Sequence, residues 1–468
     1  MFERMDGAGL LAEMAGAQRA ERVAVARRLL AAGRLCQLRM AEVDDADRLQ
    51  WCIDNWEAVA AEVGAELGIS RGRASSQMNY GVELLERLPA LAAVFAAGEV
   101  DFRVIATVVF RTGLITDPAV LAGIDAALAV RAPRWNAHSR ARVADLVDWW
   151  VRAADPAAVR LTRSAEADRH IDFGPTRDGM TEFWGALRAP EAAALDRRLD
   201  QLIATVCRAD PRTKPQKRAD VLIALSAGQT AMPCECGGQD CPARDTGCDI
   251  AAAAPAPIVI HLLAEAATIT GDSDAPAYLP GHGAIPAADV RTLAARAQLR
   301  PLARPQDLRA EPRYHPSVAL AAFVKARDLS CRFPGCDKPA EVCDIDHTIP
   351  WSAGGPTHPS NLKLLCRLHH LTKTFWTAWH DVQQPDGTVT WTSPSGRTYT
   401  TTPGGALFFP QLAVPTESIT QTFERPDSTG RTQRMPTRRR SRADERAARI
   451  RWERGVNQAR MNADPPPF

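Results

Sequence analysis

The chain has 468 residues, of which 46% are hydrophobic and 24% charged, an ordinary composition for a soluble globular protein of about two or three domains. Its formal net charge of +2 argues against nucleic-acid binding over the whole surface, so any basic footprint must be local. Charged residues interrupt the longest apolar runs, so we expect no signal peptide and no membrane span. We predict a cytoplasmic protein whose eleven cysteines are reduced or metal-bound.

Residues 1–230 are predicted to form an all-α domain. Ala, Leu, Arg and Glu dominate this region, apolar residues recur at spacings of three and four, and proline or glycine separates the segments. Within it, residues 64–75 have the small-residue turn and polar second segment of a helix-turn-helix. A helical hairpin buried in a core has the same pattern, so DNA reading and core packing both remain open for this segment.

Four cysteines lie close together in the next region, 231–257. They are Cys234, Cys236, Cys241 and Cys248, in a stretch with almost no core-forming residues. Because such a loop gains order from a metal, we predict a second structural zinc site here, and the alternative is a set of exposed loop thiols. An Ala/Pro linker follows over 251–257. Residues 258–315 are predicted as a small α+β segment, with a buried strand at 258–263 and a helix at 287–297.

Residues 316–400 carry the candidate catalytic groups. Asp346 and His347 are adjacent on a predicted strand, and His370 lies on a predicted helix that runs from Cys366 toward Trp376. Hydrolysis of a phosphodiester requires a base, a divalent cation and a rigid frame that holds both. Asp346, His347 and His370 can supply the base and the ligands of the cation. Alternation along the strand points His347 away from Asp346, toward an attacking water. Asn361 follows a Gly-Gly reversal, and its amide can fix the loop or the base. Strand, loop and helix make a ββα-metal arrangement.

Two close-spaced ligand pairs interleave with these groups. The pairs are Cys331 with Cys336, and Cys366 with His369. These soft or borderline ligands suit a tetrahedral zinc ion, which would be structural because so small a unit has little apolar area to offset its chain entropy. Cys343 could replace His369 as the fourth ligand. Beyond the site, a Pro-Asp-Gly turn at 385–387 predicts a hairpin.

The C-terminal region, 401–468, is predicted to be a largely disordered Arg-rich tail. From 425 to 468 it contains twelve Arg against five acidic residues and few apolar ones. Arg438, Arg439, Arg440 and Arg442 are the candidates for sequence-independent contacts to phosphate. A solvated tail without a partner is the alternative.

The chain resembles the actinobacterial HNH endonucleases often called thirteen-E-twelve repeat proteins, which join a large uncharacterised N-terminal domain to a C-terminal HNH module. The resemblance rests on motifs along nearly the whole chain: Asp210-Pro211-Arg212-Thr213, Leu279-Pro280-Gly281, Val324-Lys325-Ala326-Arg327-Asp328, Cys331-Arg332-Phe333-Pro334-Gly335-Cys336 and Asp346-His347 through Lys373-Thr374. The C-terminal motifs identify a chemistry, whereas the others identify only a lineage.

The resemblance implies roles for four residues. Asp346 and His370 would bind the catalytic ion, Mg²⁺ or Mn²⁺, with His347 as general base and Asn361 as positioning residue. It implies a metal-dependent endonuclease acting on nucleic acid, with double-stranded DNA favoured and the oligomeric state open. The alternative is a nucleic-acid or protein-binding module with a vestigial HNH site. The expected fold is mainly α: an all-α N-terminal domain, a small zinc-supported ββα-metal domain and a disordered basic tail.

Overall fold

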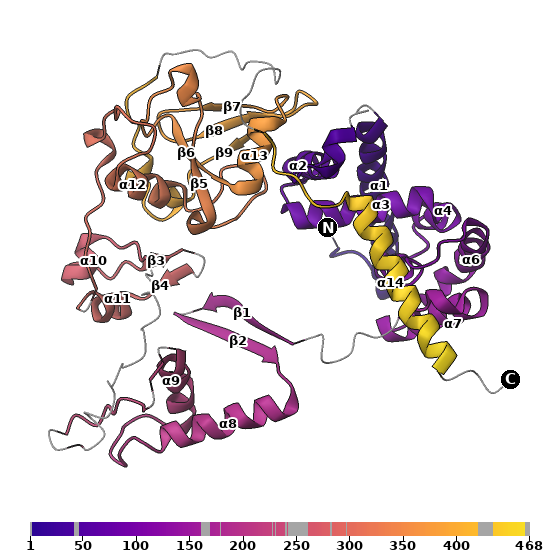
Figure 1. Cartoon of the computed structure of the whole chain (residues 1–468), viewed down its shortest axis with the longest axis horizontal. Coiled ribbons are helices and arrows are strands. Elements are labelled where there is room, and N and C mark those ends of the chain that lie inside the picture. The colour runs from indigo at the N-terminus through magenta and orange to yellow at the C-terminus, as the bar shows by residue number, and fades with distance from the viewer. Residues whose placement is uncertain are drawn as a thin grey trace. The chain divides into compact units, whose positions relative to one another are not determined.

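The computed structural model divides the chain into two compact units (Figure 1). It describes residues 2–41, 46–160, 169–177, 179–226, 228–229, 231–238, 241, 261–280, 283–295, 297–419 and 434–463. Unit 1 joins Met1–Leu161 to Arg300–Phe468, and unit 2 is Thr162–Leu299. The mainly α fold class is confirmed. The boundary predicted near residue 230 is wrong, because the helices before it pack in a small core of their own.

The first half of unit 1 is a bundle of helices: α1 (Gly7–Ala41), α2 (Asn55–Leu67), α3 (Arg71–Glu86), α4 (Pro89–Ala96), α5 (Phe102–Arg111), α6 (Pro118–Arg131) and α7 (Arg140–Ala154). Aspartates placed just before three of them accept hydrogen bonds from backbone N–H groups of the first turn, as Asp54 does for α2. One apolar core, which includes Leu84, Phe95, Val104 and Leu128, joins these helices apart from α2, which packs in other clusters. The 3₁₀ turns Ala46–Gln50, Ala132–Trp135 and Pro156–Ala158 complete this part.

The segment with a helix-turn-helix pattern corresponds to α2, a left-handed turn at Gly68 and α3. Ala61 and Ala65 of α2 pack in one buried cluster with Phe333 and Trp379 of the C-terminal half of unit 1. This burial places α2 in the core and leaves DNA reading by α3 a prediction, because the second helix of a helix-turn-helix is the one that enters the groove.

The second half of unit 1 holds the predicted strand, loop and helix. Strands β5 (Cys343–His347) and β6 (Leu362–Cys366) pair antiparallel, and helix α13 (Arg367–Phe375) follows β6 directly. A three-stranded sheet comes next, and its first two strands form the predicted hairpin. The remaining elements are α12 (Val318–Asp328), the 3₁₀ turns Pro305–Asp307, Ala340–Val342, Trp351–Ala353, Gly404–Leu407 and Pro410–Ala413, and the strands β7 (His380–Gln383), β8 (Val389–Thr392) and β9 (Thr398–Thr401).

A buried ion pair at the end of α12 anchors the ββα segment. Arg327 is 2% exposed, bonds to Asp328, and donates to the carbonyl oxygens of Pro359 and Leu362 at 2.7 and 2.6 Å. Asp328 in turn accepts from the backbone N–H of Leu364 in β6. Through these bonds Arg327 and Asp328 fix β6, the strand that leads into α13. The buried polar groups of both side chains thereby have hydrogen-bond partners.

The prediction of a disordered tail is wrong for residues 442–463, which form helix α14 (Arg442–Ala463). Arg454 pairs with Asp155 at 2.7 Å, and the Asn457 amide donates to the carbonyl oxygens of Ala157 and Val159. The tail is ordered because its charges meet fixed partners on the N-terminal bundle. Residues 420–433 and 464–468 lie outside the described part of the chain.

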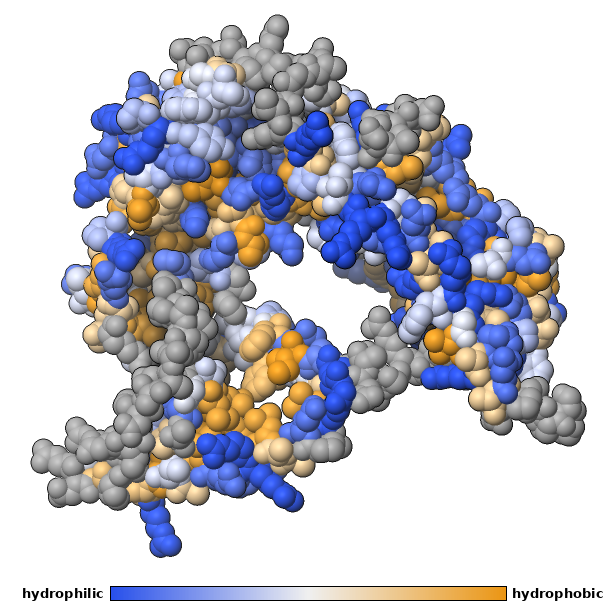
Figure 2. Space-filling model, viewed as in Figure 1, coloured by the Kyte–Doolittle hydropathy of each residue, from blue (hydrophilic) through white to orange (hydrophobic). Residues whose placement is uncertain are grey.

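Unit 2 contains a hairpin, two longer helices and a small α+β segment. The elements are β1 (His170–Arg177), β2 (Met180–Ala186), α8 (Ala189–Ile203), α9 (Lys214–Ser226), α10 (Ala266–Thr270), β3 (Ala277–Leu279), β4 (Gly283–Ile285) and α11 (Ala287–Ala294). The hairpin β1–β2 departs from the all-α prediction for residues 1–230. Its apolar side chains are largely exposed, among them Phe173 at 70% and Met180 at 74% (Figure 2).

The other expectations for this region have mixed outcomes. Residues 251–257, the predicted linker, and 258–260 of the predicted strand lie outside the described residues. Leu263 forms an isolated antiparallel bridge with Tyr278, and the predicted helix at 287–297 is present as α11. No helix built from the described residues has both the length and the apolar character needed to cross a membrane.

Candidate active site

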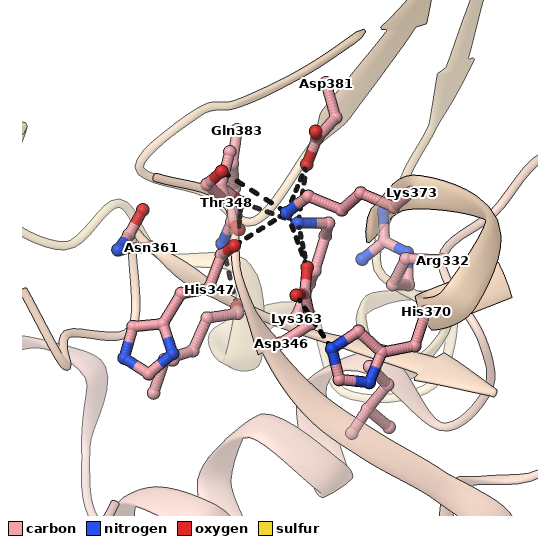
Figure 3. Close-up of polar contacts among 12 residues, drawn as sticks. Arg332, Asp346, His347, Thr348, Asn361, Lys363, His370, Lys373, Asp381 and Gln383 are labelled. Atoms are coloured by element: carbon pink, nitrogen blue, oxygen red, sulfur yellow. Dashed lines mark hydrogen bonds and ion pairs between the residues drawn. The ribbon is translucent and has the colours of Figure 1, made fainter. Parts of the chain in front are cut away.

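The β5–β6 hairpin and α13 place the predicted catalytic residues around one buried cluster of lysine and aspartate side chains. Figure 3 shows His347 and Asn361 on one side of this cluster and His370 on the other. Asp346 lies at its centre, opposite Lys363 in the strand register. The alternation expected along β5 is therefore observed, because the neighbours Asp346 and His347 face different surroundings.

His370 is held between two carboxylates of β5. Its Nδ1 lies 2.8 Å from Oδ2 of Asp344, and its Nε2 lies 3.5 Å from Oδ1 of Asp346. A histidine that binds a metal commonly donates its other ring N–H to a carboxylate, which fixes the ring and its tautomer. Asp344 is placed to accept that hydrogen bond from Nδ1 of His370. Nε2 of His370 and Oδ1 of Asp346 then face each other. The sequence analysis missed Asp344, although its place two residues before Asp346 puts both on one face of the strand.

Asp346 is buried and bonded to two lysines. Its Oδ2 accepts from Lys363 at 2.9 Å and from Lys373 at 2.6 Å. Both lysines also pair with Asp381, at 2.7 and 3.1 Å. Burial alone would raise the pKa of Asp346, but Lys363, Lys373 and His370 outweigh it and hold the pKa well below its usual range. The carboxylate stays ionised, with Oδ2 committed to lysines and Oδ1 directed at His370.

His347 is positioned by a threonine and a tyrosine. Its Nε2 lies 2.9 Å from the Thr357 hydroxyl, and its ring stacks on Tyr314 with centroids 5.3 Å apart. Thr357 donates its single proton to the carbonyl oxygen of Tyr314 at 3.3 Å. The hydroxyl must then accept from His347, which assigns the proton to Nε2 and leaves the Nδ1 lone pair free. Among the described residues Nδ1 has no hydrogen-bond partner.

The surroundings of His347 also keep its ring neutral. The pKa of His347 is lowered to about 4, mainly by burial; Asp346 opposes this effect, and Lys363 and Lys373 add to it. A neutral imidazole with a free Nδ1 is the form that accepts a proton.

Asn361 fixes the loop between the two strands. Its side-chain amide donates to the carbonyl oxygens of Ile349 and Pro356, and its Oδ1 accepts from the backbone N–H of Ile349 at 2.8 Å. Gly355 in the same loop approaches the Ile349 carbonyl so closely that a Cβ would collide with its oxygen. Of the two roles left open for Asn361, the contacts match the fixing of the loop.

The ligand set Cys331, Cys336, Cys366 and His369 converges beside α13, with all four ligand atoms within 4.8 Å of one another. The distances from His369 Nδ1 to the Sγ atoms of Cys331 and Cys366 are 3.5 and 3.3 Å, and Cys336 and Cys366 are 4.0 Å apart. A tetrahedral zinc ion would place its ligand atoms about 3.6–3.8 Å apart. Cys343, the alternative ligand, instead donates to the Lys338 carbonyl oxygen.

A second cluster forms in unit 2, but with a different fourth member from the predicted one. Cys234, Cys236 and Cys241 converge with Cys207, their Sγ atoms within 4.8 Å of one another. The predicted fourth member, Cys248, lies outside the described residues. Sequence spacing alone favoured Cys248 because Cys207 is separated from the others by helix α9.

The tail arginines divide into two kinds. Arg442 pairs with Asp54 at 3.1 Å and with Glu57 at 2.6 Å, and Arg438 lies 3.7 Å from each carboxylate. These ion pairs tie the two side chains to the bundle, and the contacts to phosphate stay a prediction. Arg439 and Arg440 are exposed and have no ion-pair partner among the described residues.

A cavity of about 360 Å³ opens beside the site. Its lining includes His370, Tyr314 and two arginines, Arg367 and Arg434. Arg367 has 66% of its side chain exposed and lies 3.6 Å from Asp344. A cavity that brings a candidate metal ligand together with cationic side chains suits an anionic substrate.

The strand–loop–strand–helix frame with Asp346, His347 and His370 defines an HNH nuclease domain, and residues 331–375 match the family described as HNH endonuclease. Residues 16–328 match the domain of unknown function DUF222. The chain belongs to the DUF222 family, with a C-terminal HNH endonuclease domain. HNH endonucleases are metal-dependent, and this domain points to a nuclease family.

Relatives at full length are known from Mycobacterium tuberculosis. The uncharacterized protein Rv3776 of strain H37Rv is 43% identical over 488 residues, covering 98% of this chain and 92% of the relative. The uncharacterized protein Rv2100 of the same strain is 43% identical over 508 residues, with 99% and 91% covered. A third, described as an uncharacterized protein in the est 3′ region, is 39% identical and covers 68% of this chain. No solved structure matches the chain.

Proposed function

We propose that this protein is a metal-dependent endonuclease of the thirteen-E-twelve type that hydrolyses phosphodiester bonds. The observation that carries the proposal is the pair of atoms His370 Nε2 and Asp346 Oδ1, 3.5 Å apart, in which Asp344 orients the His370 ring by a hydrogen bond and Lys373 donates to the other oxygen of Asp346. Next to them on β5 lies His347, a neutral histidine with a free ring nitrogen. These are the components that hydrolysis of a phosphodiester requires.

The residues fit a small divalent ion. An imidazole nitrogen and a carboxylate oxygen suit Mg²⁺ or Mn²⁺, and an ion held by few protein ligands keeps sites for water and substrate oxygens. When bound, such an ion supplies positive charge that stabilises the charge developing on the phosphate and the leaving oxygen. Asp344 keeps the His370 ring oriented, and the two lysines hold Asp346 ionised.

The chain's own groups move the proton. His347 Nδ1 takes a proton from the attacking water, and the new positive charge on the ring is spread to Nε2–H, which donates to Thr357. The stacked Tyr314 ring limits rotation of the imidazole, so the base stays aimed while water attacks the phosphorus. Asn361 contributes by keeping the loop in place.

We propose the cavity beside His370 as the binding site of the nucleic-acid backbone. Arg367 and Arg434 supply phosphate contacts there, and the exposed Arg439 and Arg440 extend the basic surface. We propose double-stranded DNA as substrate and a structural zinc ion on Cys331, Cys336, Cys366 and His369. Clustered free thiols are also consistent with the reducing cytoplasm as the compartment.

A plasmid-nicking assay tests the proposal. Purified full-length protein should nick supercoiled plasmid with Mg²⁺ or Mn²⁺ and should stop when EDTA is added. Asp346→Ala should abolish the activity, whereas Glu341→Gln, an exposed carboxylate of the same domain, should leave it unchanged. Binding to DNA without nicking under any divalent ion would support the vestigial site instead.

A further inference from the structure

We infer that unit 2 holds its own tetrathiolate zinc ion, bound by Cys207, Cys234, Cys236 and Cys241. This site is independent of the nuclease domain and lies in the part of the chain that matches the domain of unknown function. Its ligands come from both sides of helix α9, so the ion ties together the two loops that flank this helix.

The distances fit one ion better than separate thiols. All four Sγ atoms lie within 4.8 Å of one another, and Cys207 and Cys234 are 3.5 Å apart. Tetrahedral zinc, with Zn–S of about 2.3 Å, places sulfur atoms about 3.8 Å apart. A disulfide needs about 2.05 Å, and two disulfides would separate the sulfurs into two pairs and would not gather all four.

A buried ion pair independently aligns the same two loops. The Asp210 side chain is fully buried and accepts from Arg212 at 2.8 Å and from the backbone N–H of Glu235 at 3.0 Å. Arg212 also donates to the Pro233 carbonyl oxygen at 2.8 Å. Because these bonds fix residues 210–212 against 233–235, Cys207 is held beside Cys234 before any metal binds.

The packing of unit 2 explains why a metal is needed. Among the described residues, the buried cluster around α8 and α9 comprises Leu199, Leu202, Val221 and Met232, with four partly buried apolar side chains packed against it. So few apolar residues give little free energy to offset the entropy of ordering the two loops. Four thiolates that converge on one ion supply the missing stabilisation, and sulfur ligands in tetrahedral arrangement select zinc over Mg²⁺ or Mn²⁺.

Metal analysis of the full-length protein tests the inference. After an EDTA wash that removes loosely bound ions, elemental mass spectrometry should find two zinc ions per chain. Cys207→Ser should lose one of them, whereas Cys248→Ser, the matched control from the rival ligand set, should keep both. Cys331→Ser should lose the other ion, which separates this site from that of the nuclease domain.

A thiol-protection experiment on the wild-type protein covers the case in which Cys207→Ser does not fold. Under native conditions Cys207, Cys234, Cys236 and Cys241 should resist iodoacetamide until a strong chelator is added, and Cys248 should react at once. Protection of Cys248 with reaction of Cys207 would overturn the inference. So would disulfides among these cysteines, iron in place of zinc, or a zinc count that Cys207→Ser does not change.

Discussion

Asp344→Ala is the substitution that best probes the metal side of the proposed site. Asp344 accepts from His370 Nδ1 at 2.8 Å, and no other residue among those described bonds to that nitrogen. Without it the His370 ring can turn, and Nε2 loses its fixed position 3.5 Å from Asp346 Oδ1. Loss of such a supporting carboxylate costs about 10–100-fold in metal affinity or activity, equivalent to about 1.4–2.7 kcal/mol.

The assay is plasmid nicking across a titration of Mn²⁺. The half-saturating Mn²⁺ concentration for Asp344→Ala should rise by about 10–100-fold, with the maximal rate much less affected, because the ligands themselves remain. Asp344→Asn should show a smaller rise, since the amide oxygen still accepts a hydrogen bond. Glu341→Gln controls for loss of charge. A Mn²⁺ dependence of Asp344→Ala that overlays the wild-type curve would refute this role.

Three further predictions test other parts of the structure. Thr357→Val should lower the nicking rate without changing the Mn²⁺ dependence, because it removes the hydroxyl that fixes the His347 tautomer; an unchanged rate would contradict the assignment of the base to Nδ1. Cys331→Ser should unfold the nuclease domain, seen as loss of cooperative melting and of one zinc, because zinc binding supplies about 10–16 kcal/mol in small domains; a native-like melt would show that the ion is dispensable. Arg442→Ala should lower the free energy of unfolding of unit 1 by about 1–2 kcal/mol, measured in urea. The loss is modest because Arg442 is partly exposed and Glu57 retains its ion pair with Arg71. An unchanged urea midpoint would show that the Arg442 ion pairs do not stabilise the fold.

Arg442→Ala also carries a pH signature. Burial opposes ionisation of Glu57, but Arg71 and Arg442 outweigh it and lower its pKa. A carboxylate with a lowered pKa stabilises the fold above its unfolded pKa, and this contribution is lost as the pH falls through the folded value. Without Arg442 the folded pKa of Glu57 moves back toward its unfolded value, so the variant should lose less stability than the wild type as the pH falls below that unfolded value. Parallel profiles of melting temperature against pH would contradict this.

The parts of the site that were predictable from sequence are local ones. Asp346, His347 and His370 lie within 25 residues on a strand, loop and helix whose periodicities are visible in the chain. Asp344 is equally local, and the period of two along β5 was sufficient to find it. Thr357 could not be found in this way, because its hydroxyl meets His347 only after the Asn361 loop folds back.

The features that sequence reasoning missed depend on contacts between distant segments. Cys207 joins the second cysteine cluster only because Asp210 and Arg212 align two loops separated by helix α9. Helix α14 has an Arg-rich composition typical of disorder, and its order follows from Asp54 and Glu57, nearly 400 residues earlier in the chain. Composition and local periodicity contain no information on such pairs.

The nicking rate of His347→Ala relative to the wild type, measured at saturating Mn²⁺, tests the central claim most directly. Loss of a general base should lower the rate by about 10²–10⁴-fold. Zinc content should stay at the wild-type value, because His347 touches neither cysteine cluster. A rate within about tenfold of the wild type would remove His347 from the mechanism, and with it the proposed base of this endonuclease.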